Sequence, residues 1–459
     1  MRKRHVAIVA LALTASACGW VEEQRERGRK SQAATDFVAL AESNNVAAVR
    51  AEVAKDRTLV NSLRSVSGRK SSYKTESALT AALKAGHREM VDVLLELGAD
   101  PNLADGTDAL PLSVAISAPK EPMALVTALL DKGADPLRTN SAGETAVHQA
   151  VSGRTKDKEG AELLALILDR THATGGPNAR GLTVLHLAAN ADSLPAIRLL
   201  VQKGVDPNVR TTAPRPDAAF SGDVAGATPL ALVARDRQID AAAALCALGA
   251  DPDLADSTGA SARQVAASVA ATEGKRDKPI DVDLARHRNM AAFLAKGAEC
   301  DALLARKRRG EAIPDAEVDR IANESECGAG YGWACGRAGW AYYKGEGAPE
   351  DDKRALPLFR KGCDGALTRN EWACGMAGVI LVENRGVPGD PVEAARWLLK
   401  GCEPADPKRA DEQACNRLGM LHAEGRGVAQ DLARARALFK KACDAKYERA
   451  CKNLEKYKG

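Results

Sequence analysis

The stretch GRGVAQDLARARALFKKACDAKYERAC (residues 425–451) contains the pattern that organises the C-terminal third of this chain. Counted back from Cys443, glycine lies 16 positions upstream, aspartate 12, alanine 8 and phenylalanine 4. The same positions before Cys363 and Cys402 hold the same residue types, with leucine once replacing phenylalanine. Each of these three cysteines also follows another cysteine by 28 positions, namely Cys335, Cys374 or Cys415. The shared register predicts an array of structural repeats.

Each unit of this array reads as a pair of helices. Glycine ends the first helix because it accepts the left-handed backbone conformation of a helix C-terminus. Aspartate begins the second helix as a cap or first-turn acid. Alanine and phenylalanine or leucine, four positions apart, give the second helix its buried stripe. The sequence therefore predicts a rigid helix pair inside each 28-residue interval.

The gaps between the units vary in length from 8 to 13 residues. Two antiparallel helices joined by a turn keep their ends close, whatever the length of the turn. We therefore expect each gap to be closed by a disulfide worth about 2–3 kcal/mol. The expected pairs are Cys327–Cys335, Cys363–Cys374, Cys402–Cys415 and Cys443–Cys451. Pairing across the 28-residue interval is the alternative.

These motifs resemble the Sel-like repeats, relatives of the tetratricopeptide (TPR) repeat, and in particular their cysteine-rich secreted subclass. The resemblance covers residues 300–459, and residues 446–459 look like a capping helix. It implies a disulfide-stapled, TPR-like α-solenoid.

A second periodicity occupies residues 36–299. LLELGADPN (94–102), LLVQKGVDPN (199–208) and LCALGADPD (245–253) recur, each after a helix-capping Thr or Ser about twenty residues earlier. This pattern resembles the ankyrin repeat and implies about seven repeats, with a degenerate first unit and insertions at 210–225 and 272–283. The expected fold is all-α: an ankyrin-repeat solenoid fused to the Sel-like solenoid.

The junction of the two arrays contains one unassigned cysteine pair. Cys300 and Cys327 are 27 positions apart, so residues 300–327 read as a degenerate first Sel-like unit. By the same logic Cys300 pairs backwards, and Cys246 is the remaining partner. The alternative is that Cys246 is a small buried thiol.

The N-terminus resembles a bacterial lipoprotein signal. Arg2, Lys3 and Arg4 precede an apolar run at 6–14 that is too short to span a bilayer, and Ala15-Ser16-Ala17-Cys18 follows. The resemblance implies a signal peptide at 1–17, lipid on Cys18 and a polar tether at 18–35. Ala15-Ser16-Ala17 also fits ordinary secretion. Gly19, in place of aspartate, favours an outer-membrane lipoprotein that faces the periplasm or the cell surface.

Charge and motifs argue against several classes of function. The formal charge of +4 falls to about +1 without the three basic residues at 2–4, so we expect no nucleic-acid partner. Ser-x-x-Lys occurs at 67–70, 71–74 and 117–120, without the Lys-Thr-Gly or Ser-Asp-Asn of penicillin-interactive enzymes. The histidines lack ligand spacing, and disulfides explain the cysteines better than zinc does. We therefore expect no enzyme, metal or cofactor.

Aromatic residues supply the candidate contacts to a partner. Trp340, Tyr342 and Tyr343 lie on one predicted helix and cannot all face inward, so one or two should line a binding surface. Phe220, in the 210–225 insertion, either pins that loop or meets a partner. Trp333 and Trp372 either form a contact patch or cover the disulfides.

The sequence thus predicts a monomeric, non-catalytic scaffold or adaptor, lipid-anchored at the bacterial envelope, that binds a protein or peptide through its repeats. Fold alone does not fix function. One alternative is a periplasmic immunity protein that neutralises a secreted lipase-type toxin. The other is a cysteine-rich Sel-like protein that binds or hydrolyses β-lactams.

Overall fold

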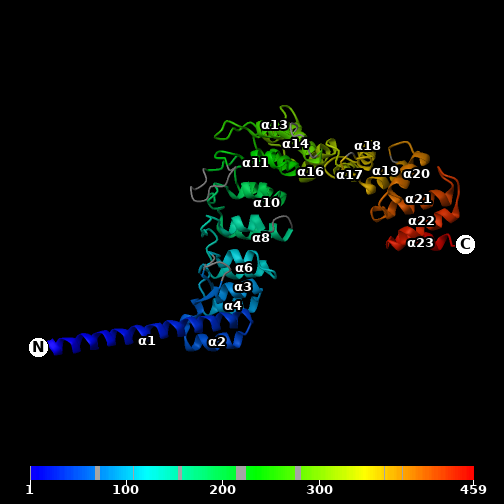
Figure 1. The fold of residues 1–459 in the computed structure, drawn as a ribbon. Helices are drawn as coiled ribbons and strands as arrows, with labels where there is room; N and C mark the ends of the chain where they lie inside the picture. Colours follow the sequence, from blue (N-terminus) through cyan, green and yellow to red (C-terminus); the bar gives the residue numbers. More distant parts are fainter. Residues whose placement is uncertain are drawn as a thin grey trace. The chain divides into compact units, whose positions relative to one another are not determined.

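The computed structural model describes residues 2–67, 73–106, 108–153, 158–212, 224–273, 281–365, 367–384 and 386–458. It is 64% helical, as the sequence predicts (Figure 1). The chain divides into two compact units, residues 1–191 with 212–223 and residues 192–211 with 224–459. This division falls inside the ankyrin-like array rather than at residue 300, because each repeat of a solenoid packs only against its neighbours.

The first unit is built from helix pairs that follow one another along the chain. A 3₁₀ helix, η1 (Arg57–Asn61), follows the first pair. The helices are α1 (Arg2–Glu42), α2 (Val46–Lys55), α3 (Ala78–Ala85), α4 (Arg88–Glu96), α5 (Pro111–Ile116), α6 (Pro122–Asp131), α7 (Ala146–Gly153), α8 (Lys158–Thr171) and α9 (Val184–Asn190).

Helix α1 contains the residues expected to form the signal peptide and the tether. It is continuous, and its side chains from residue 22 to 33 are exposed. From Ala34 onward it becomes part of the stack, since Phe37, Val38 and Ala41 are buried. None of the described helices combines the length and the hydropathy that a bilayer span requires.

A β-hairpin follows the first helix pair, and the all-α expectation did not include it. β1 (Leu63–Ser67) pairs antiparallel with β2 (Tyr73–Ser77), with Leu63 opposite Ser77. The segment is rich in serine, which is typical of turns, and in lysine, which is depleted in strands, so it gives little strand signal. The hairpin is stabilised by packing of β1 against α1.

The second unit continues the helix pairs and ends on a single helix. A 3₁₀ helix, η3 (Pro407–Arg409), lies before α21. The helices are α10 (Leu194–Gln202), α11 (Pro229–Asp236), α12 (Ile239–Leu248), α13 (Ala262–Glu273), α14 (Asp281–Phe293), α15 (Glu299–Arg308), α16 (Asp315–Gly328), α17 (Gly332–Lys344), α18 (Asp352–Cys363), α19 (Glu371–Glu383), α20 (Pro391–Cys402), α21 (Glu412–Glu424), α22 (Leu432–Asp444) and α23 (Glu448–Lys456).

The aspartates of the cysteine register have the role that the sequence predicts, whereas the C-caps of the first helices are Gly345, Asn384 and Gly425, two positions before the register glycines. Asp351, Asp390 and Asp431 cap α18, α20 and α22, each accepting a hydrogen bond from the backbone N–H three positions on. The glycine in the middle of each first helix allows close contact with the second helix. A Cβ atom on Gly378 would lie 2.5 Å from Cγ of Leu398.

All ten cysteines after Cys18 lie in five pairs at disulfide distance, in the expected pairing. Across the four variable gaps the Cα atoms are 4.5 to 4.7 Å apart. Cys246 and Cys300 form the fifth pair, with a Cα separation of 5.3 Å, and join α12 to α15. The alternative of pairing across the 28-residue interval is wrong, because each first helix lies beside the preceding second helix at that end.

Candidate functional site

A groove between α16, α17 and α19 contains two of the residues singled out from the sequence, Trp340 and Trp372. We call it the aromatic groove, and its volume is about 390 Å³. All of its walls belong to the second unit. Its main lining residues are Asp319, Arg320 and Asn323 of α16, Arg337 and Trp340 of α17, and Trp372 of α19.

The rings of Trp340 and Trp372 form one wall of this groove. Their centroids are 5.5 Å apart, and the centroid of the Tyr343 ring lies 5.6 Å from that of Trp340. Phe359 contacts Trp372 edge-on at 5.7 Å and is itself fully buried. Lys344 Nζ lies 5.0 Å from the Trp340 ring centroid. Packed rings of this kind present a large apolar surface that loses little conformational entropy on binding.

The three aromatic residues of α17 differ in burial, as expected for side chains that point in different directions from one helix. Tyr342 is buried, and its hydroxyl accepts hydrogen bonds from Arg320 at 3.0 Å and Arg354 at 3.3 Å. Tyr343 is half-buried, and its hydroxyl donates to Glu383 at 3.1 Å. Trp340 lines the groove directly. Tyr342 therefore belongs to the interior, whereas Trp340 lines the groove and Tyr343 packs against the Trp340 ring.

The other aromatic candidates have different outcomes. Trp372 contributes to the groove wall rather than only covering a disulfide. Trp333, at the equivalent position one unit earlier, is 37% exposed and contacts Tyr331. The two tryptophans share the WACG motif, so the motif alone could not separate them. Phe220 lies outside the described residues.

Asn323 supplies a polar group to the groove floor. It is 5% exposed, and its amide nitrogen donates to the carbonyl of Asp319 at 2.6 Å. Its Oδ1 atom has no hydrogen-bond partner among the residues that the structure describes. A buried acceptor without a partner is costly. The structure thus leaves one unsatisfied acceptor buried beneath the groove.

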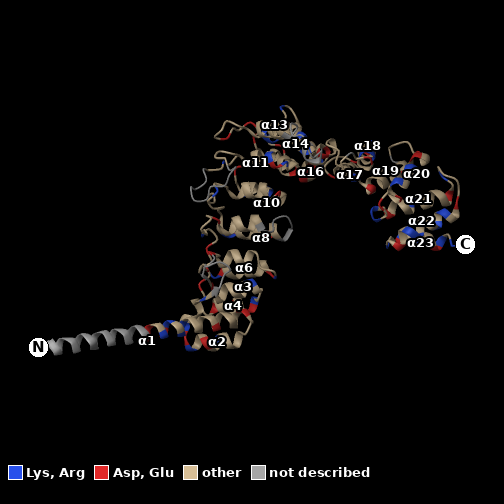
Figure 2. Cartoon of the chain, in the orientation of Figure 1, with Lys and Arg blue, Asp and Glu red and all other residues tan. Residues whose placement is uncertain are grey.

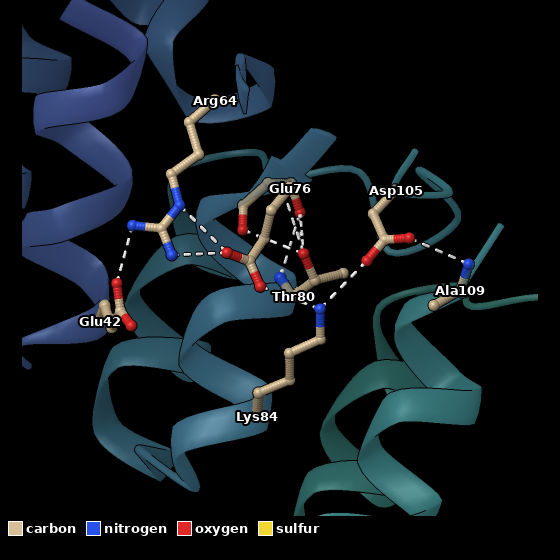
Figure 3. Close-up of polar contacts among 8 residues, drawn as sticks. Glu42, Arg64, Glu76, Thr80, Lys84, Asp105 and Ala109 are labelled. Carbon is tan, nitrogen blue, oxygen red and sulfur yellow. Dashed lines mark hydrogen bonds and ion pairs between the residues drawn. The ribbon is translucent and has the colours of Figure 1, made fainter. Parts of the chain in front are cut away.

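The first unit contains a second, more polar pocket of about 400 Å³. Its lining includes Lys84 of α3, Ser113 and Ser117 at α5, and Gln149 of α7. Lys84 is fixed at the edge by ion pairs to Glu76 at 2.9 Å and Asp105 at 3.2 Å (Figure 3). This pocket has a polar rim held by ion pairs, and its exposed lining is more polar than apolar.

A chain of ion pairs, which we call the charge ladder, connects Lys84 at that rim to Arg64 and Glu42 through Glu76. Arg64 links Glu76, at 2.6 Å, to Glu42, at 2.7 Å, and Asp105 accepts from the backbone N–H of Ala109 at 3.0 Å (Figure 3). Burial opposes ionisation of Glu76, but hydrogen bonds from Lys84 and Arg64 outweigh it and lower the pKa of this carboxyl. The charge ladder thus ties α1, the hairpin and α3 together.

The histidines of the ankyrin-like pattern have structural positions. His148 and His186 are buried, and each Nδ1 lies 2.8 Å from the hydroxyl of the threonine that caps its own helix. Burial lowers the pKa of His148 to about 4, which keeps the ring neutral. In the described part of the chain no three His, Cys, Asp or Glu side chains are placed to hold a metal ion.

The Ser-x-x-Lys segments show no shared site. Ser117 follows the last turn of α5, and Lys120 is exposed in the turn before α6. Ser67 lies in β1 and Lys74 in β2, whereas Lys70 and Ser71 lie outside the described residues. The expectation that these matches arise by chance stays a prediction.

The fold and these surfaces define a helical repeat protein made of two kinds of repeat. Residues 76–106 match the ankyrin-repeat family model, and residues 112–211 and 159–256 match the model for three ankyrin copies. Residues 334–366, 374–403 and 412–447 match the Sel1 repeat. The chain thus contains ankyrin repeats followed by Sel1 repeats.

Similar proteins cover only parts of the chain. The transient receptor potential channel pyrexia of Drosophila melanogaster is 32% identical over 134 residues, which is 28% of this chain. The chain spans only 13% of that relative's length. The ankyrin domain of Bcl-3 covers 50% of this chain and 92% of its own, at 22% identity and a TM-score of 0.40. An ankyrin domain from Acinetobacter baumannii covers 47% and 98%, at 20% identity and a TM-score of 0.36.

Proposed function

We propose that this chain is a non-catalytic adaptor that holds an extended segment of a partner protein in its aromatic groove. The observation that carries the proposal is the Trp340–Trp372 wall above the buried Asn323 acceptor. Aromatic side chains in packed pockets supply most of the energy at protein interfaces. An extended segment has backbone N–H groups that can satisfy Asn323 while its apolar side chains contact the rings.

The proposal includes attachment to the bacterial envelope through Cys18, at an outer membrane that faces the periplasm or the cell surface. The cysteine motif at 15–18 supports it, as does the pairing of ten cysteines, which is typical of an oxidising compartment. Labelling growing cells with a radioactive fatty acid tests the anchor. Label should enter the wild-type chain and be absent from Cys18→Ser, and label retained in that variant would rule out lipidation at Cys18.

The groove is tested by affinity capture with the full-length chain in detergent-solubilised envelopes. A Trp340→Ala/Trp372→Ala variant should lose at least one specifically captured protein. Trp397→Ala is the matched control, because Trp397 lies on α20, outside the aromatic groove, and bonds to Glu393 at 2.9 Å. Capture that is equal for wild type and the double variant would contradict the groove as the binding site.

A further inference from the structure

A smaller pocket lies between α21 and α23, and its charge differs from that of the aromatic groove. We call it the basic pocket, and its volume is about 280 Å³. Arg417 and Met420 come from α21, and Arg449 and Lys452 come from α23. None of the residues that line it is acidic. Figure 2 shows lysine and arginine along α22 and α23.

The two cations of α23 have no carboxylate partner among the described residues, and both are exposed. Other cations of this array do reach a carboxylate of a neighbouring repeat, as in Arg360–Glu393 at 2.6 Å and Arg409–Glu371 at 2.7 Å. Arg449 and Lys452 therefore leave a local positive potential that an anionic ligand can neutralise.

Two hydrogen-bonded asparagines form the floor of the basic pocket. Asn416 is 4% exposed, and its Oδ1 accepts a hydrogen bond from Nδ2 of Asn453 at 2.8 Å. This pair fixes the relative position of α21 and α23 under the cations. Arg417 is held by Glu383 at 3.1 Å, so the guanidinium on the opposite wall is also oriented.

The aromatic groove and the basic pocket are linked by one carboxylate. Glu383 of α19 accepts from Tyr343 of α17 and from Arg417 of α21. The residues that make these contacts thus lie along one face of three successive first helices. Neighbouring helices lie about 8–10 Å apart, so α17 and α21 are separated by about 20 Å. An extended peptide covers that distance with about six residues.

We propose that the basic pocket binds the carboxylates of an acidic stretch that continues the segment held in the aromatic groove. The ligand is an extended peptide with apolar side chains at one end and Asp or Glu side chains about six residues away. An arginine on this face already forms an ion pair with a carboxylate, namely Arg417 with Glu383. This inference rests on the proposed function and specifies the chemistry of the partner.

The test measures binding of a fluorescein-labelled decapeptide to the purified full-length chain by anisotropy. The probe has an apolar half that alternates leucine and serine, followed by a half made of glutamates. A second probe replaces the glutamates by glutamines. The protein variants are Arg449→Gln/Lys452→Gln and, as the control of equal charge change, Lys361→Gln/Arg396→Gln. Lys361 and Arg396 are exposed on α18 and α20 and do not line either site.

The wild-type chain should bind the glutamate probe at least about ten-fold more tightly than the glutamine probe. Arg449→Gln/Lys452→Gln should abolish this difference. Lys361→Gln/Arg396→Gln should preserve it. Equal binding of the two probes, with both losing affinity in Trp340→Ala, would overturn this inference and leave the proposed function standing. Equal weakening by both double variants would also overturn it, as would preference for an oligonucleotide of the same charge. If neither probe binds but Trp340→Ala/Trp372→Ala still loses captured protein, the inference of an acidic peptide ligand is overturned and the proposed function stands. Circular dichroism and free-thiol counts establish that each variant is folded.

Discussion

Arg198 of α10 donates to Asp319 of α16 at 2.9 Å, although 121 residues separate them in the chain. The same guanidinium also pairs with Asp315 at 2.9 Å, and the Arg198 side chain is only 17% exposed. The contact joins α10, which lies in the ankyrin repeats, to α16, which precedes the first matched Sel1 repeat. Because Asp319 lines the aromatic groove, Arg198 also helps to position one wall of that groove.

Replacing Arg198 by alanine should lower the free energy of unfolding by about 1–2 kcal/mol, because a largely buried guanidinium loses one charge-assisted hydrogen bond, to Asp319, and one ion pair, to Asp315. Urea denaturation followed by circular dichroism measures this change. Lys440→Ala removes an exposed pair with Asp444 and should change stability by less than about 0.5 kcal/mol. Equal effects of the two variants would show that the Arg198 contacts do not stabilise the junction.

Removal of the Cys246–Cys300 disulfide should destabilise the protein more than removal of Cys443–Cys451. The first bridge closes a loop with a sequence separation of 54, and the second a separation of 8. Chain entropy gives about 4 kcal/mol for the long loop and about 2.5 kcal/mol for the short one. Melting of the two Cys→Ala double variants compares them. The opposite order would mean that the terminal bridge holds more of the structure than its loop length indicates.

Stability of the second unit should fall as the pH rises toward 7. Burial, reinforced by Asp240, raises the pKa of Glu326 to about 7, while Arg286 and Arg337 partly oppose the shift. The folded state therefore holds a proton that the unfolded state releases near its ordinary pKa of 4.5. This contribution is complete below about pH 4.5 and is lost through pH 7, up to about 3 kcal/mol.

Glu326→Gln should flatten this pH dependence, since glutamine keeps the neutral shape and has no proton to release. Urea midpoints at pH 5 and pH 8 measure the slope for wild type and variant. Glu424→Gln changes an exposed carboxyl of α21 and should leave the wild-type slope in place. An unchanged slope in Glu326→Gln would remove this residue as its cause.

Gly378→Ala should destabilise the protein by about 1–3 kcal/mol, because the added methyl group would overlap Leu398 and approach the carbonyl of Ala394 at 3.0 Å. Gly328→Ala is the matched control, since an added Cβ there meets nothing within 4 Å. That change should be neutral or stabilising by up to about 1 kcal/mol. Thermal melts of both variants test the close approach of α19 and α20.

The cysteine register predicted the helix pairs and the disulfide partners because both depend on local spacing. It could not assign the rings of α17, whose directions depend on other helices. Arg320 and Arg354 hold the Tyr342 ring in the interior, and Glu383 holds the Tyr343 hydroxyl toward α19. The β1–β2 hairpin also gave little signal, because contact with α1 supplies part of its stability. The basic pocket was missed because Arg417, Arg449 and Lys452 come together only when α21 and α23 pack.

The order of the five disulfides along the chain bears on how they could form in an oxidising compartment. Every pair joins two cysteines that are consecutive in the sequence once Cys18 is set aside. An oxidase that links thiols in the order of their emergence would therefore produce the native pairing without an isomerase. If Cys18 kept a free thiol, the same rule would pair Cys18 with Cys246 and would displace every later pair by one cysteine. If the Cys18 thiol is blocked early, by lipid or by another route, each later cysteine still pairs with its native partner.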